Sequence, residues 1–76
     1  MKDDLENITW LIENGGDISI GRFDPVRCAA TACDEPGQIA ALVKKPNESL
    51  MDLLKRLDES IEIAWEEERY IDEINH

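Results

Sequence analysis

The sequence predicts a small α+β domain of the order helix, strand, strand, strand, helix, in which two helices pack on one face of a three-stranded antiparallel meander. Apolar residues recur at helical spacing near both ends of the chain, whereas they alternate with polar or small residues between positions 17 and 44. Turn-forming residues separate the alternating segments. The 76 residues give room for one domain over 1–76, and their 42% of hydrophobic side chains exclude a disordered acidic chain.

The first helix is predicted at about residues 3–14. Asp3 or Asp4 can cap its N-terminus, and Glu6 can complete a capping box with Asp3. The pair Gly15–Gly16 supplies the left-handed residue that commonly closes a helix. Its apolar residues predict one buried stripe: Leu5, Ile8 and Ile12, with Leu11 beside them.

Three strands are predicted at about 17–23, 26–33 and 38–44. The dipeptide Asp24-Pro25 marks the first turn, and Pro36-Gly37 occupies the centre of a type II turn between the second and third strands. Because alternate side chains of a strand point to opposite faces, one sheet face is covered by the helices. The other face carries small residues, which depending on register are Ala29, Thr31, and Ala40 or Ala41.

The second helix is predicted at about residues 48–67 or longer. Asn47 or Ser49 can cap it, and Ser49 with Asp52 resembles a capping box. The spacing of Ile71 and Ile74 leaves open whether residues 69–74 continue the helix. A single apolar stripe is predicted to face the sheet: Leu50, Leu53, Leu54, Leu57, Ile61, Ala64 and Trp65.

Negative charge is concentrated in this second helical region. Residues 47–76 hold ten acidic and three basic side chains, a net charge of −7 out of the −10 of the whole chain. Such a charge repels nucleic-acid phosphates and anionic membranes, and no apolar run approaches the roughly 18 residues of a membrane span. The predicted partner is therefore a protein with a basic surface, with no direct nucleic-acid binding and no membrane. The alternative is that the charge only keeps a small protein in solution.

Acidic residues repeat every seven positions and fall on one outer face of the helix if it continues to residue 73. Exposed acids near a helix C-terminus oppose the helix dipole at a cost of about 0.3–1 kcal/mol each, so stability alone does not explain them. The predicted partner-binding residues are Asp52, Glu59, Glu62, Glu66 and Glu73.

The order of the elements resembles that of double-stranded-RNA-binding domains, and the small sheet followed by a helix resembles the antitoxins of some toxin and antitoxin pairs. The RNA-binding domains place a lysine cluster at the start of their second helix, where this sequence has Asn47, Glu48, Ser49 and Asp52. Because the charge is reversed there, the resemblance implies a topology and not RNA binding.

No catalytic residue, metal site or cofactor is predicted, and we expect no enzyme activity. The single histidine is His76, and Cys28 and Cys33 lie on opposite faces of the second strand, so they make neither a zinc set nor a bridge within that strand. We expect both thiols to be free and half-buried. The helical carboxylates lack a calcium-binding loop and the facing arrangement that acid–base catalysis needs.

The two tryptophans have different predicted places. Trp65 lies on the apolar stripe of the second helix and is predicted to be core, whereas Trp10 lies at the boundary of the first stripe. Trp10 is therefore either half-exposed core or a candidate interface anchor. The apolar far face of the sheet makes a homodimer a second expectation, since a domain of this size is marginally stable alone.

These features predict a non-catalytic acidic binding protein that presents an acidic helix face to a basic partner surface. Carboxylates along a rigid helix can imitate a row of phosphates, so a nucleic-acid mimic or inhibitor is the favoured form, of the anti-defence type that phages and mobile elements encode. The alternative is a small structural or regulatory homodimer, similar to an antitoxin. The first residues, MKDDLENI, contain no apolar segment that predicts secretion, so the expected location is the cytoplasm.

Overall fold

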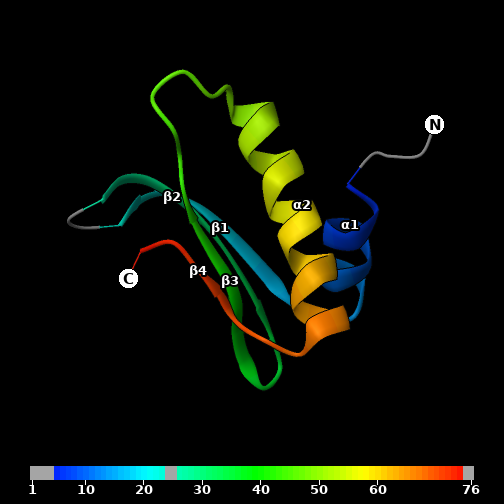
Figure 1. Ribbon diagram of the computed structural model, residues 1–76. Coiled ribbons are helices and arrows are strands. Elements are labelled where there is room, and N and C mark those ends of the chain that lie inside the picture. Colours follow the sequence, from blue (N-terminus) through cyan, green and yellow to red (C-terminus); the bar gives the residue numbers. More distant parts are fainter. Residues whose placement is uncertain (1–4, 24–25, 75–76) are drawn as a thin grey trace.

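The computed structural model describes residues 5–23 and 26–74, which form two helices and one sheet (Figure 1). The predicted α+β class is confirmed, and the three predicted strands begin and end within one residue of their expected bounds. The second helix begins two residues later than expected and ends at Glu67. The elements are α1 (Glu6–Glu13), β1 (Asp17–Phe23), β2 (Val26–Asp34), β3 (Gly37–Val43), α2 (Leu50–Glu67) and β4 (Ile71–Asp72).

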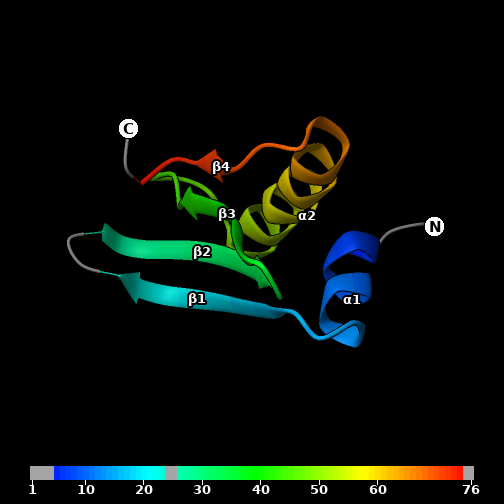
Figure 2. The same cartoon turned by 90° about the horizontal axis from the view of Figure 1, so that it is seen from below.

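Within the described residues the sheet has four strands in the order β1-β2-β3-β4 (Figure 2). The pairs β1/β2 and β2/β3 are antiparallel, as the meander predicts. The strand β4 was not predicted: after α2 the chain returns and pairs in parallel with β3, with Ile71 opposite Ala40 and Asp72 opposite Ala41. The continuation of α2 into residues 69–74, left open by the sequence, is thereby excluded.

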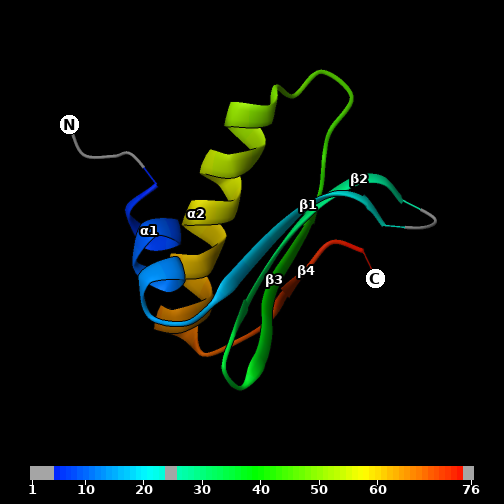
Figure 3. The same ribbon diagram turned by 180° about the vertical axis from the view of Figure 1, so that it is seen from behind.

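Both helices contribute to one core on one face of the sheet, as predicted. The register places Ala32 opposite Ile18 and Ala40, and Ala30 opposite Leu42. Small alanine side chains at the centre of the sheet allow α2 to approach closely, and α1 lies beside α2 near the start of β1 (Figure 3). The buried cluster comprises Leu11, Ala30, Ala32, Ala40, Leu42, Leu53, Leu57 and Ile61.

The predicted orientation of α1 is wrong by about one residue's rotation. Leu11 is its buried residue, at 1% exposure, whereas Ile12 is 48% exposed. The eight-residue helix packs against α2 as well as the sheet, and Leu11 fills the space between them, so the neighbouring Ile12 turns to solvent. The helix also starts at Glu6, after Leu5 in a left-handed conformation (φ 59°), while the predicted caps Asp3 and Asp4 lie outside the described residues.

Both helix ends that the sequence marked most clearly are confirmed. Gly15 has a φ of 93°, and the Gly16 N–H donates to the Leu11 carbonyl at 2.8 Å, which closes α1 in a Schellman motif. At the start of α2, the Ser49 hydroxyl accepts a hydrogen bond from the Asp52 N–H at 3.0 Å.

The sheet face away from the helices carries Ala29, Thr31 and Ala41, whereas Ala40 faces the helices. Ala29 and Ala41 are only 2% and 1% exposed in the single chain. A second copy of the chain would therefore gain little burial from these two alanines.

Candidate binding surface

Four of the five predicted partner-binding carboxylates lie on the outer side of α2 and are exposed. Helical geometry places them opposite the buried residues Leu53, Leu57 and Ile61. Lys55 lies on the same outer side between Asp52 and Glu59, so the negative charge is most concentrated from Glu59 onward. We call the four residues the acidic ridge: Asp52, Glu59, Glu62 and Glu66.

The carboxylates of the acidic ridge are largely without internal partners. In residues 5–23 and 26–74, the described ion pairs involve Glu48, Glu67 and Glu73 and none of the ridge residues. Glu62 of the ridge accepts one hydrogen bond, which the Asn7 side-chain amide donates at 3.4 Å. Four exposed charges without a cation are available to an external basic surface.

The fifth predicted residue, Glu73, is not on the acidic ridge. It follows β4, and its carboxylate accepts one hydrogen bond from the Val43 N–H at 2.9 Å and another from Arg56 at 2.8 Å. The prediction assumed that α2 continues to residue 73, but Glu68 adopts a left-handed conformation (φ 53°) and ends the helix. Glu73 therefore attaches the chain end to the fold instead of facing a partner.

Arg56 on α2 organises a cluster of contacts that the sequence did not predict. Its guanidinium donates to both oxygens of Glu48, at 2.7 and 3.0 Å, and to the Val43 carbonyl at 2.8 Å. The hydrogen bond from Arg56, with a second from the Lys45 N–H, lowers the pKa of Glu48 from 4.5 to about 2. This cluster joins the loop before α2 to the segment after β4.

Asp58 on α2 takes the place of a missing cap on α1. Its carboxylate accepts from the Ile8 N–H at 2.8 Å and from the Asn7 side-chain amide at 3.1 Å. Leu5, at the N-cap position, makes no side-chain cap hydrogen bond. The first turn of α1 is therefore satisfied by its neighbouring helix.

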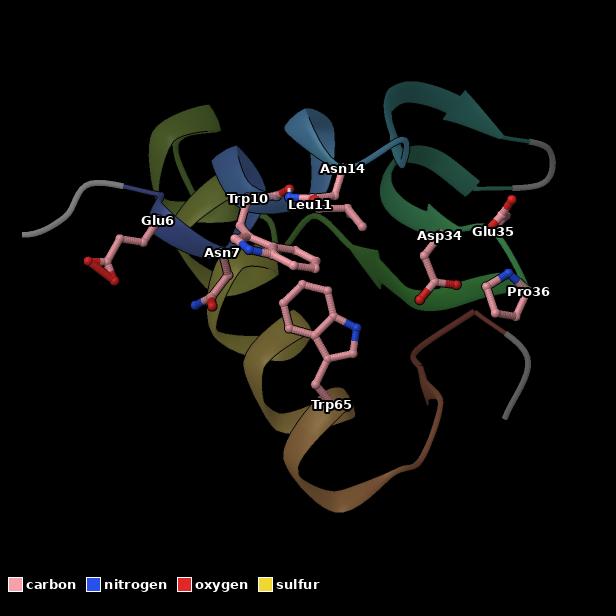
Figure 4. Close-up of a pocket in the computed structure, with 9 residues that line it drawn as sticks. All are labelled: Glu6, Asn7, Trp10, Leu11, Asn14, Asp34, Glu35, Pro36 and Trp65. Atoms are coloured by element: carbon pink, nitrogen blue, oxygen red, sulfur yellow. Dashed lines mark hydrogen bonds between the residues drawn. The ribbon is translucent and has the colours of Figure 1, made fainter.

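A groove of about 690 Å³ lies where α1, α2 and the β2–β3 turn meet (Figure 4). Both tryptophans line it, with ring centroids 5.2 Å apart in an edge-to-face arrangement at 79°. Trp65 is half-buried against the core, while Trp10 is 55% exposed at the edge of the core. We call this the tryptophan groove; its lining includes Glu6, Asn7, Trp10, Asp34, Glu35 and Trp65.

Three carboxylates lie around the tryptophan groove. Figure 4 shows Asp34 directed into the groove beside Trp65, whereas Glu6 and Glu35 point away from its centre. One oxygen of Asp34, Oδ1, is buried without a hydrogen-bond partner in the part of the chain that the structure describes. Because Oδ1 is covered by the chain, a ligand in the groove would meet the other oxygen of this partly buried carboxylate.

A second groove of about 590 Å³ lies on the other side of Asp34. Tyr70 and Arg69 line it, but Arg69 already pairs with Glu67 at 2.7 Å, and the Tyr70 hydroxyl donates to Gln38 at 2.9 Å. Burial raises the pKa of Tyr70 above its ordinary value. Arg69 and Tyr70 are therefore engaged in internal contacts, whereas Asp34 is shared with the tryptophan groove.

The remaining candidate groups form no assembled site in the described residues. Cys28 and Cys33 are free and half-buried. No three His, Cys, Asp or Glu side chains of residues 5–23 and 26–74 gather in a geometry that could hold a metal ion. Neither described helix combines the length and apolarity needed to cross a bilayer.

The sequence located the acidic ridge, but the tryptophan groove joins residues as far apart as Trp10 and Trp65. The one indication of this groove in the sequence was the position of Trp10 at the boundary of the first apolar stripe. The spacing of residues gave no indication that Asp34 would take part. Comparison with known proteins gives no match to this chain among family models, curated protein sequences or solved structures.

Proposed function

We propose that this protein is a non-catalytic binding protein that presents the acidic ridge of α2 to a basic surface of a protein partner. The observation that carries the proposal is the set of four exposed carboxylates on one side of an 18-residue helix, none of which forms an ion pair within the described residues. The helix is held by a buried stripe and by Arg56 at its flank, so the charges are presented on a fixed support.

The position of Glu66 supports a binding role over a stabilising one, whereas Asp52 in the first turn of α2 is also favourable for the helix dipole. Glu66 lies in the last turn of α2, which has no basic residue, and its charge opposes the helix dipole. Removing this charge is expected to raise stability slightly, whereas a complementary basic surface would gain from it.

An inhibitor that imitates nucleic acid is the form we favour. Glu59, Glu62 and Glu66 are separated by about 4.5 and 6 Å along the helix axis, a spacing of the same order as the charge repeat of a nucleic-acid strand. A partner groove that holds phosphates would bind such a row of carboxylates in competition with its nucleic-acid ligand. The free thiols suit a reducing compartment such as the cytoplasm, where we propose that this binding takes place.

The test is capture of partners from a cell lysate at low salt, followed by elution at high salt. The ridge variant Glu59→Gln with Glu66→Gln removes two charges and spares Glu62, which contacts Asn7. The control Glu13→Gln with Asp17→Asn removes two exposed charges elsewhere. We expect the ridge variant to lose at least tenfold in affinity for a captured basic protein and the control less than twofold; equal loss in both would overturn the proposal.

The alternative, a small regulatory homodimer, has less support because Ala29 and Ala41 on the far sheet face expose almost no area. Light scattering tests it directly: a mass near 8.7 kDa at high concentration excludes the dimer.

A further inference from the structure

We propose that the tryptophan groove binds an arginine side chain, carried on an exposed segment of the basic partner. The proposal deepens the proposed function by naming a second contact and the residue type that it receives. It rests on the geometry of Trp10, Trp65 and Asp34 and not on the acidic ridge.

The aromatic surface is the first part of the argument. Trp10 is the most exposed large apolar side chain among the described residues, at 55%. The edge-to-face contact with Trp65, at 5.2 Å between centroids, fixes its ring while leaving much of the indole surface open. Tryptophan is the aromatic side chain that attracts cations most strongly, so a planar cation is favoured over a neutral side chain.

The charge around the aromatic surface is the second part. Asp34 points into the groove and forms no ion pair among the described residues, and Glu6 and Glu35 stand at its margins (Figure 4). The surrounding carboxylates attract a cation that stacks on the indole and so increase its affinity, whereas they do not favour an apolar or acidic occupant.

The arrangement selects arginine over lysine. A guanidinium is flat, stacks on an indole and presents paired N–H donors to one carboxylate, whereas an ammonium is a compact and strongly hydrated charge. In the tryptophan groove the stacking surface and the carboxylate of Asp34 flank the same space. The volume of about 690 Å³ exceeds one side chain, so neighbouring residues of the segment also enter.

The groove lies next to the acidic ridge. Asn7 lines the groove and donates hydrogen bonds to Glu62 of the ridge and to Asp58. A partner that lies along the ridge would therefore meet the groove at the same interface, with the ridge providing long-range attraction and the groove a specific anchor.

The experiment follows the two indole N–H signals of the ¹⁵N-labelled full chain by NMR. The probe is a nine-residue peptide with three arginines separated by glycine and serine, compared with peptides carrying lysine or citrulline at the same positions. We expect saturable shifts of both indole signals and an affinity at least about fivefold higher for the arginine peptide than for the lysine peptide. Unmoved indole signals, or equal affinity for lysine, would overturn the proposal.

Matched variants test the carboxylate. Asp34→Asn should lower the affinity for the arginine peptide about five- to tenfold, while Glu13→Gln, which removes an exposed charge outside the groove lining, should change it less than twofold. Trp10→Leu should abolish the response of the Trp65 indole, and preserved amide dispersion shows that the fold is intact. Equal effects of Asp34→Asn and Glu13→Gln would indicate charge alone and would overturn the assignment.

The same measurements separate this proposal from the acidic ridge. Peptide binding that survives in the Glu59→Gln, Glu66→Gln variant with unchanged indole shifts supports the groove even if partner capture fails. Binding that disappears in that variant while Asp34→Asn has no effect supports the ridge and refutes the groove.

Discussion

Glu48 is the residue whose protonation state contributes most clearly to the pH dependence of folding. Arg56 and the Lys45 N–H lower its pKa from 4.5 to about 2 in the folded chain. Because the folded pKa is lower than the unfolded one, the contribution is complete above about pH 4.5 and is lost as the pH falls toward 2.

We therefore expect Glu48→Gln to destabilise the protein most at pH 6–7. In urea unfolding followed by circular dichroism, the difference from the wild type should narrow steadily below pH 4.5. A difference that stays constant down to pH 2.5 would contradict the Arg56 contact as its cause.

Gly16 is fixed by close approach of the chain. A Cβ at this position would lie 2.7 Å from the Cys33 carbonyl oxygen and would also overlap the side chain of Leu11. Gly16→Ala should therefore lower the free energy of unfolding by about 1–3 kcal/mol, as overpacking does in other cores. Glu13→Ala, at the exposed last residue of the neighbouring helix α1, should stay within about 0.5 kcal/mol in the same urea experiment.

At the scale of elements, α1 depends on α2 for its N-terminal hydrogen bonds. Removing the carboxylate in Asp58→Ala leaves the Ile8 N–H without its acceptor and removes the shorter of the two Asn7 amide hydrogen bonds, at an expected cost of about 1–2 kcal/mol. Hydrogen exchange should show the amides of α1 losing protection before those of β2 and β3. Glu59→Ala, one residue along α2, is the control, and equal exchange of α1 in both variants would argue against this dependence.

The backbone at the C-terminus of α2 is strained at one residue, and a substitution there can relieve the strain. Glu68 holds a left-handed conformation (φ 53°) that glycine adopts without penalty. Glu68→Gly should raise the free energy of unfolding by about 0.5–1 kcal/mol. By contrast, Glu66→Gly inside the last turn should lower it by about 1 kcal/mol, so thermal melts of the two variants should shift in opposite directions.

At the scale of the whole molecule, charge repulsion acts against the compact state. The chain has a net charge of −10, concentrated on α2, where the ridge residues lack internal cations among the described contacts. Raising sodium chloride from about 20 mM to about 0.5 M screens this repulsion and should raise the melting temperature. The rise should be smaller in the Glu59→Gln, Glu66→Gln variant; a melting temperature that falls with salt would contradict this view.

The sequence was sufficient where a local pattern decides the structure. Alternation in β1, β2 and β3 predicted the sheet. The apolar stripe of α2 predicted its core residues Leu53, Leu57 and Ile61 and the outward ridge, but Leu50, placed on the same stripe, is 54% exposed. The sequence was insufficient where contacts between residues far apart in the chain decide the structure. The rotation of α1 follows from packing against α2, β4 has only two residues and no period, and Glu73 is placed by Arg56.

The candidate site shows the same division. The acidic ridge is periodic within one helix and was predictable, apart from Glu73. The tryptophan groove assembles Trp10, Asp34 and Trp65 from three elements, and no spacing in the sequence brings them together.

The pairing of β4 with β3 bears on whether other chains can add a strand to this sheet. Residues 39–43 of β3 form an unbroken apolar run, the kind of segment that recruits other chains when its backbone is free. The Glu73 N–H donates to the Ala41 carbonyl at 2.8 Å, and Arg56 holds the Glu73 carboxylate in place. The segment after α2 thus occupies the backbone of β3 at Ala40 and Ala41, where an added strand would otherwise pair, and Arg56 contacts that segment through Glu73.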